Sequence, residues 1–165
     1  GVVGVDFTPA MLEIAGRKMA RKQIGVPVGF EAGDAMRLPA VDASVDVVSI
    51  AFGIRNVADP RKAMGEFYRV LRPGGRLIVL EFSLPENAIL RGLYQFYFQK
   101  ILPWTASLIA RDRTGAYRYL PKSVSTFLGR EAMTRMMHEA GFGAVSQKVL
   151  SLGIAVIYRA DKTAG

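Results

Sequence analysis

The residues best suited to chemistry lie in one seven-residue stretch, Ala51-Phe52-Gly53-Ile54-Arg55-Asn56-Val57. It follows the apolar run 45–50 and precedes Asp59-Pro60, a pair typical of a helix start with Asp59 as the N-cap. The pattern therefore predicts a loop at the carboxyl end of a buried strand. In open α/β sheets, ligands bind at these strand ends.

Within this stretch, Gly53 allows close backbone approach, Arg55 offers a guanidinium and Asn56 offers a carboxamide. Such a loop is well equipped to hold a ligand. The same spacing fits a purely structural loop, in which Gly53 turns the chain while Arg55 and Asn56 cap the next helix. Spacing alone leaves both interpretations open.

Two carboxylates lie at comparable points of the chain. The apolar run 2–5 predicts a strand buried on both faces that ends at Asp6, and a second short strand over 28–32 is followed closely by Asp34. A carboxylate at such a strand end can accept two hydrogen bonds from ribose hydroxyls, which indicates an adenosine-containing cofactor. Each acid alone also fits a structural role, Asp6 as a helix N-terminal charge and Asp34 as a turn residue. Two acids at matching strand ends are more specific.

The elements that must position these residues alternate along the first half of the chain. After the first strand, a helix is expected from Pro9 to near Gly25, with Thr8 as its N-cap. Its predicted buried stripe is Met11, Leu12, Ala15 and Met19. Further along, a strand over 45–50, a helix over 60–71 and a strand over 76–81 continue the alternation. This order predicts an α/β fold with right-handed crossovers and a mostly parallel twisted sheet.

The second half departs from this alternation. Residues 83–122 predict no strand, only an aromatic-rich helical segment and a basic loop. A last helix over 130–140 precedes strands over 144–150 and 153–159, which must be antiparallel because their link is so short. We therefore expect one domain over residues 1–165, with 83–122 as a helical insertion.

Composition excludes several classes of function. The 165 residues contain no cysteine and one histidine, which argues against a thiolate or histidine metal site and against a Ser-His-Asp triad. The basic residues that give the net charge of +8 are spread along the chain, and no DNA- or RNA-binding module is recognised. We predict no metal and no nucleic-acid partner. Attraction to an anionic membrane surface stays open.

Several motifs together resemble one known family. They are Val3-Gly4-Val5-Asp6, Gly33-Asp34-Ala35, the 51–57 stretch, Tyr68–Gly75, Leu80-Glu81-Phe82-Ser83 and Tyr117-Arg118-Tyr119-Leu120-Pro121. Over essentially its whole length the chain is similar to class I S-adenosylmethionine methyltransferases, and among them to the ubiquinone/menaquinone biosynthesis C-methyltransferases. The Arg-Pro-Gly-Gly turn is common to many class I enzymes. The 51–57 stretch followed by Leu-Glu-Phe-Ser is far more specific.

The resemblance implies S-adenosyl-L-methionine as cofactor and a Rossmann-like sheet with a C-terminal antiparallel pair. It places Asp6 on the ribose, Phe7 on the adenine face and Asp34 on the adenine amino group. The other cofactor-binding positions that it implies are Ala35, Ala51 and Gly53. Relatives often have serine at the position of Ala51, so one hydrogen bond is absent here.

The implied reaction methylates a ring carbon of a polyprenylated quinol, with Arg55 and Asn56 as the catalytic pair. A guanidinium stays charged at working pH, so we expect Arg55 to stabilise a forming phenolate and not to accept its proton. The expected substrate-facing lid residues are Tyr94, Phe98, Trp104 and Tyr117. Plain packing of the insertion on the sheet explains many of these aromatics equally well.

The family resemblance also implies a strand and a Gly-rich loop before Val2, with the strand lying between those at 2–6 and 45–50. We therefore expect this chain to be a fragment with unpaired inner strand edges. The resemblance implies a cytoplasmic enzyme that contacts the membrane peripherally and forms a homodimer. The alternatives are a non-catalytic subunit of a biosynthetic complex and a class I methyltransferase for another small molecule. Benzoquinol and naphthoquinol acceptors are not distinguished by these motifs.

Overall fold

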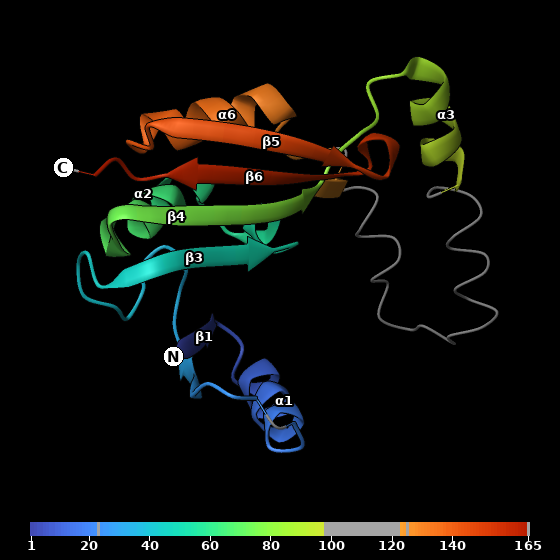
Figure 1. The fold of residues 1–165 in the computed structure, drawn as a ribbon. Coiled ribbons are helices and arrows are strands. Elements are labelled where there is room, and N and C mark those ends of the chain that lie inside the picture. Colours follow the sequence, from blue (N-terminus) through green and yellow to red (C-terminus); the bar gives the residue numbers. More distant parts are fainter. Residues whose placement is uncertain (23, 98–122, 125, 165) are drawn as a thin grey trace.

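A mixed four-stranded sheet forms the centre of the computed structural model, which describes all residues except 23, 98–122, 125 and 165. Its strand order is β3 (Val45–Ala51), β4 (Leu71–Phe82), β6 (Ala155–Asp161) and β5 (Ala144–Leu150). Strands β3 and β4 are parallel, whereas β6 is antiparallel to both β4 and β5. The predicted strands and the antiparallel C-terminal pair are confirmed (Figure 1).

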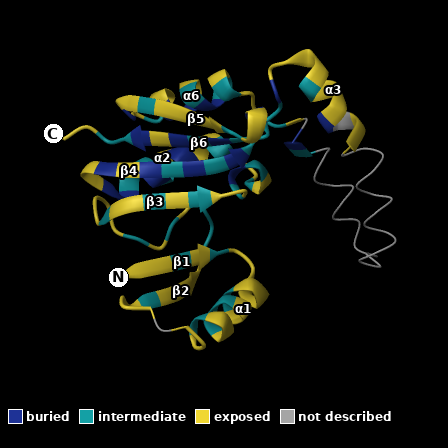
Figure 2. Ribbon diagram, turned by 45° about the vertical axis from the view of Figure 1, so that its right-hand side comes forward, coloured by how far each residue is buried: buried dark blue, intermediate teal, exposed yellow. Residues whose placement is uncertain are grey.

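A second, smaller unit contains β1 (Val2–Asp6), β2 (Val28–Ala32) and α1 (Pro9–Met19). Strands β1 and β2 pair in parallel, and no ladder joins β1 to β3 within the described residues. Figure 2 shows β1 and β3 running in the same direction with β2 on the far side of β1. The expectation of unpaired inner edges on β1 and β3 is therefore confirmed for the described chain.

Burial in this smaller unit differs from the sequence prediction. We predicted that β1 is buried on both faces, but Val2 and Val3 are 55% and 63% exposed. The predicted buried stripe of α1 is also wrong, because α1 has no buried residue and Met11 is exposed. The physical reason is that the described chain places no further layer over these apolar side chains, which Figure 2 shows as exposed ribbon.

Helix α1 begins at Pro9 after Thr8 as predicted, but it is shorter than predicted. It ends at Met19, with Ala20 as its C-cap, and does not continue to Gly25. Thr8 occupies the N-cap position but its side chain makes no capping hydrogen bond. The backbone amide of Thr8 donates to Oδ1 of Asp6 at 2.8 Å, and the Thr8 carbonyl oxygen accepts from the Met11 amide at 3.0 Å.

The core lies between the four-stranded sheet and two helices, α2 (Pro60–Val70) and α6 (Arg130–Glu139). Asp59 caps α2 as predicted, since its side chain accepts from the amides of Arg61 and Lys62. Apolar residues of both helices meet the inward face of β4 and β6. The buried members are Ile54, Ala63, Met64, Phe67, Leu71, Leu77, Val79, Met133, Met136, Met137, Phe142, Val156, Tyr158 and Ala160.

Strand β4 is longer than the sequence predicts. It begins at Leu71, directly after α2, so the Arg72-Pro73-Gly74-Gly75 segment lies inside the strand and not before it. The register between β3 and β4 shifts between Val45 and Val47, which accommodates the irregular start. Gly75 is needed there, because a Cβ would lie 2.9 Å from the Arg72 carbonyl oxygen and 3.0 Å from that of Asp46.

The segment after β4 carries α3 (Ala88–Phe96), which Asn87 caps through the amides of Ile89 and Leu90. Arg130 of α6 fixes the start of this segment by donating to Ser83 Oγ and to the carbonyl oxygens of Leu84 and Gly153. Gly153 belongs to the short 3-10 turn Ser151–Gly153 between β5 and β6. Among the described helices, none combines the length and the hydropathy that a membrane span requires.

Candidate functional site

A buried ion pair lies where the carboxyl ends of β3 and β4 meet. Arg55 belongs to the 3-10 turn η1 (Ile54–Asn56) after β3, and Glu81 is the second-last residue of β4. Arg55 Nη1 lies 2.6 Å from Glu81 Oε1, and the two side chains are only 8% and 1% exposed. This geometry follows from the parallel pairing of β3 with β4, which brings their carboxyl ends to one edge of the sheet.

Each member of the pair has further partners. Arg55 Nη1 also donates to the Phe52 carbonyl oxygen at 2.7 Å, and Nε donates to Ser123 Oγ at 3.4 Å. Glu81 Oε1 accepts from the Phe82 amide at 2.8 Å, while Oε2 accepts from the Arg55 amide at 3.4 Å. The Arg55 guanidinium lies 5.2 Å from the centre of the Phe82 ring. The pair is therefore held by backbone, side-chain and aromatic contacts together.

The loop that carries Arg55 is shaped by Phe52. Phe52 has a φ of 54°, in the left-handed region that non-glycine residues rarely adopt, and its ring packs on Phe82 with 4.4 Å between centroids. Gly53 has a φ of −112°, so Phe52 and not Gly53 is the left-handed residue of this turn. The missing side chain of Gly53 leaves room for Ile50, which a Cβ would approach to 3.1 Å.

The capping part of the structural alternative for this loop is wrong. Neither Arg55 nor Asn56 caps α2, because Asp59 supplies that cap. The amide of Asn56 reaches back to the Phe52 carbonyl oxygen at 3.4 Å, and Arg55 is committed to Glu81. Asn56 is exposed beside the buried pair.

The predicted cofactor acids share one local geometry. Oδ1 of Asp6 accepts from the Thr8 amide and Oδ1 of Asp34 accepts from the Met36 amide, both at 2.8 Å. Each carboxylate is thus oriented by the amide two residues further on, and no hydrogen bond to either Oδ2 occurs within the described chain. The second oxygen of each acid is left for a donor such as a hydroxyl or an amino group.

The remaining cofactor positions lie in the same loops. Phe7 is 79% exposed, directly after Asp6, and Ala35 is half-buried beside Asp34. Ala51 is the last residue of β3 and is exposed. Asp6 and Asp34 follow the two-stranded sheet, whereas Ala51, Gly53 and Arg55 follow β3 of the four-stranded sheet. These residues therefore follow strands of two separate sheets, because no described strand pairs with both β1 and β3.

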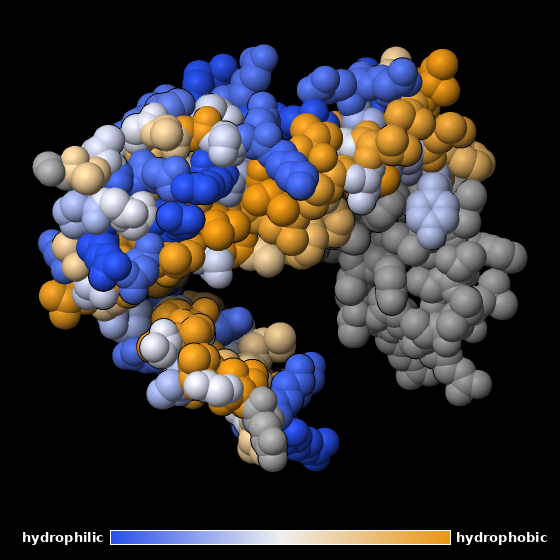
Figure 3. Space-filling model, viewed as in Figure 1, coloured by the Kyte–Doolittle hydropathy of each residue, from blue (hydrophilic) through white to orange (hydrophobic). Residues whose placement is uncertain are grey.

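One of the predicted lid residues, Tyr94, lies within the described residues. Phe98, Trp104 and Tyr117 lie outside the described residues. Tyr94 on α3 is 8% exposed, and burial raises the pKa of its hydroxyl while the nearby Arg55 charge opposes that rise. Tyr94 therefore lies within electrostatic reach of Arg55. Figure 3 shows apolar surface around the carboxyl ends of β3 and β4 and toward α3.

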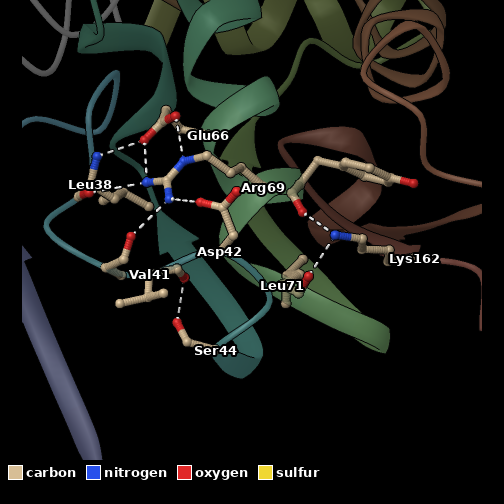
Figure 4. A network of polar contacts seen from close by, with 10 residues as sticks. Leu38, Val41, Asp42, Ser44, Glu66, Arg69, Leu71 and Lys162 are labelled. Carbon is tan, nitrogen blue, oxygen red and sulfur yellow. Dashed lines mark hydrogen bonds and ion pairs between the residues drawn. The ribbon is translucent and has the colours of Figure 1, made fainter.

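A second ionic network holds the connection between β2 and β3 against α2 (Figure 4). Arg69 donates through Nε and Nη2 to the two carboxylate oxygens of Glu66, each at 2.8 Å, and through Nη1 to the Ala40 carbonyl oxygen and Asp42. Glu66 also accepts from the Leu38 amide at 2.9 Å. On the same helix end, Lys162 donates to the carbonyl oxygens of Tyr68 and Leu71. We call the Glu66, Arg69 and Asp42 group the connection clamp.

Sequence reasoning did not identify Glu81 as a site residue. The sequence feature that could have identified it is an acidic residue directly after the apolar run 77–80, at the end of a predicted strand. The same feature identified Asp6. Phe52 and Phe82 were also missed, because aromatic residues beside a strand end are usually plain core residues. Within the described residues, no group of three His, Asp or Glu side chains could hold a metal.

The fold and the site together indicate a class of protein. A sheet with parallel strands followed by a C-terminal antiparallel pair, with ligand-type residues at the strand ends, is that of the class I S-adenosylmethionine-dependent methyltransferases. A SAM-dependent methyltransferase from Thermotoga maritima superposes with a TM-score of 0.63 at 26% identity, covering 97% of this chain and 72% of that chain. Another from Aquifex aeolicus has a TM-score of 0.65 at 16% identity, covering 98% and 68%.

Within this class, the chain belongs to the ubiE/COQ5 methyltransferase family, whose model matches residues 1–162. It is 49% identical to a demethylmenaquinone methyltransferase of Thermus thermophilus over 98% of this chain and 71% of that protein. A demethylmenaquinone methyltransferase of Deinococcus radiodurans is 44% identical over 98% and 65%. A ubiquinone/menaquinone biosynthesis C-methyltransferase of Geotalea daltonii is 38% identical over 98% and 68%. The chain thus spans 65–71% of the length of these relatives.

Proposed function

We propose that the protein to which this chain belongs transfers a methyl group to a ring carbon of a polyprenylated quinol in menaquinone or ubiquinone biosynthesis. Demethylmenaquinol or 2-methoxy-6-polyprenyl-1,4-benzoquinol would be the acceptor. The observation that carries the proposal is the buried Arg55–Glu81 pair at the carboxyl ends of β3 and β4, in a chain 49% identical to a demethylmenaquinone methyltransferase. The naphthoquinol is favoured, because the two relatives of highest identity given above bear that name.

The chemistry explains why a fixed cation is useful here. A neutral aromatic carbon is a weak nucleophile, and transfer of the neighbouring phenolic proton to a water molecule pushes electron density onto the ring. Arg55 would stabilise the resulting phenolate, because a preorganised cation in a water-poor site acts most strongly on developing charge. Asn56, exposed beside Arg55, is a hydrogen-bond donor for the same oxygen.

The residues present fit S-adenosyl-L-methionine, which supplies an electrophilic methyl group on a sulfonium when bound. The Oδ2 atoms of Asp6 and Asp34 would accept from ribose hydroxyls and from the adenine amino group. The exposed Phe7 ring would pack on the adenine, with Ala35, Ala51 and Gly53 as close backbone contacts. These roles are proposals that the geometry of the two acids supports.

The substrate side and the cellular setting are proposed on the same basis. Tyr94 and the apolar surface around α3 would cover the ring and the start of the prenyl chain, together with Phe98, Trp104 and Tyr117. A prenylated acceptor partitions into the bilayer, so we propose peripheral contact with the cytoplasmic face of the membrane, aided by the net charge of +8. A homodimer is the oligomeric state we propose.

The test uses the full-length protein with radiolabelled S-adenosylmethionine and two short-chain acceptors, a demethylmenaquinol and the corresponding benzoquinol. We expect label to reach the naphthoquinol ring. The matched variants are Arg55→Lys, which keeps the charge but loses the planar guanidinium, and Arg61→Lys, an exposed arginine on α2. Arg55→Lys should lower kcat by at least about tenfold, as loss of one oriented donor does in comparable sites. Near-normal turnover of Arg55→Lys would contradict the role given to Arg55.

A non-catalytic scaffold subunit of a biosynthetic complex is the alternative. It predicts that the full-length protein transfers no methyl group to either quinol, even with cofactor present in excess. Transfer to an unrelated small molecule, with none to quinols, would instead support a class I methyltransferase of different specificity.

A further inference from the structure

Glu81 is an unusual residue for its location. Its side chain is 1% exposed at the end of β4, close to the core residue Val79 and beside the aromatic ring of Phe82. Buried ion pairs are often no better for stability than apolar residues of similar size, because both charges lose their hydration. Stability alone therefore does not account for a carboxylate here, and its contacts indicate what it does.

Those contacts fix the guanidinium of Arg55 on several sides. Nη1 is shared between Glu81 Oε1 and the Phe52 carbonyl oxygen, and Nε faces Ser123 Oγ. Among the described residues, Nη2 of Arg55 has no hydrogen-bond partner. The Phe52 carbonyl that completes this arrangement belongs to a residue in the left-handed region, so the backbone itself is bent to meet the guanidinium.

We infer that Glu81 is a positioning residue for the quinol reaction: it fixes Arg55 so that Nη2 is presented to the phenolic oxygen, and it partly offsets the charge that this oxygen experiences. The inference rests on the proposed function. It assigns to β4 a part in the reaction that the loop residues Arg55 and Asn56 do not supply themselves.

If Glu81 offsets the charge of Arg55, its substitution should change the pH dependence of the reaction. A purely structural role of Glu81 predicts no such change. Glu81→Gln retains an oxygen that accepts from Arg55 Nη1 but removes the negative charge. A phenol beside an uncompensated cation loses its proton at lower pH. The acidic limb of the pH profile of kcat should therefore move down by about one pH unit in Glu81→Gln. Glu81→Leu, which loses the anchor as well, should lower kcat at least about tenfold with the KM for S-adenosylmethionine changed less than about threefold.

The experiment uses full-length protein, with Glu66→Gln as the matched control. Glu66 is also paired with an arginine through two short hydrogen bonds, but in the connection clamp. We expect its substitution to change stability and leave the pH limb in place. If the acidic limb of the kcat profile does not move in Glu81→Gln and only the midpoint of thermal unfolding falls, the inference is overturned and Glu81 is a structural residue.

A binding measurement separates this inference from the proposed function. The ultraviolet absorbance of 2-prenyl-1-naphthol, bound in the presence of S-adenosylhomocysteine, reports its ionisation without turnover. A lower apparent pKa in Glu81→Gln than in wild type supports the inference even if no quinol is methylated. Equal values in both proteins overturn it even if the wild type is an active methyltransferase. This readout also holds if Glu81→Leu does not fold.

Discussion

At the scale of single residues, two glycines have opposite effects on packing. Gly75 lies in β4 where backbone carbonyl oxygens of Arg72 and Asp46 leave no room for a Cβ. Gly65 lies on the exposed side of α2, and a Cβ there meets nothing within 4 Å. The sequence predicts a helix around Gly65 and a turn at Gly75, but it does not show the contact of Gly75 with Asp46, which comes from the neighbouring strand β3.

We expect Gly75→Ala to lower the free energy of unfolding by about 1–3 kcal/mol, since the added methyl group must displace backbone. Gly65→Ala should raise it by about 0.5–1 kcal/mol, because alanine is the better helix former. Urea denaturation of both variants followed by circular dichroism measures the difference. Two variants that shift stability in the same direction would contradict the assigned packing.

At the scale of elements, the connection clamp makes the attachment of residues 38–42 to α2 depend on pH. The pKa of Glu66 is lowered, mainly by its hydrogen bonds from Arg69 and also by the Leu38 amide, against an opposing effect of burial. The same bonds, with those to Asp42, raise the pKa of Arg69. Arg69 stays charged throughout, so the Glu66–Arg69 pair changes charge in the acidic range through Glu66.

A lowered pKa means that the folded state binds this proton less readily than the unfolded chain. The stabilisation from Glu66 is therefore fully present above the unfolded glutamate pKa of about 4.3 and is lost as pH falls through the lower folded value. We expect Glu66→Gln to flatten the dependence of unfolding free energy on pH in that window. Urea titrations at pH 3 to 6 measure it, with the exposed Glu131→Gln as control. An unchanged slope in Glu66→Gln would contradict the clamp.

The elements also show how far sequence could predict the fold. Apolar periodicity and the Asp59-Pro60 signal were sufficient for α2 and for most strand limits, because those signals are local. The end of α1 at Met19 and the missing Thr8 side-chain cap were not predicted from the sequence. The Arg55–Glu81 pair joins residues 26 apart, and only the pairing of β3 with β4 brings them together. Loop position predicted Arg55, whereas its partner required the fold.

At the scale of the whole molecule, burial is strongly uneven. No described residue before Ile54 is buried, whereas the sheet β3-β4-β6-β5 and its helices contain the core. Units with few buried contacts open at lower free energy than the core. We expect the backbone amides of β1 and β2 in this chain to exchange hydrogen at least about a hundredfold faster than those of β4 and β6. Hydrogen–deuterium exchange mass spectrometry under native conditions measures these rates. Equal protection in the two sheets would contradict this picture.

The unpaired edges of β1 and β3 also affect how this chain behaves in a concentrated solution. Free strand edges beside exposed valines are templates for pairing between molecules, and proteins usually block them with charge or a covering element. The net charge of +8 keeps molecules apart at low ionic strength, and salt screens that repulsion. Light scattering should therefore rise with both protein concentration and sodium chloride. A Val3→Lys substitution on β1 should delay the onset of this aggregation.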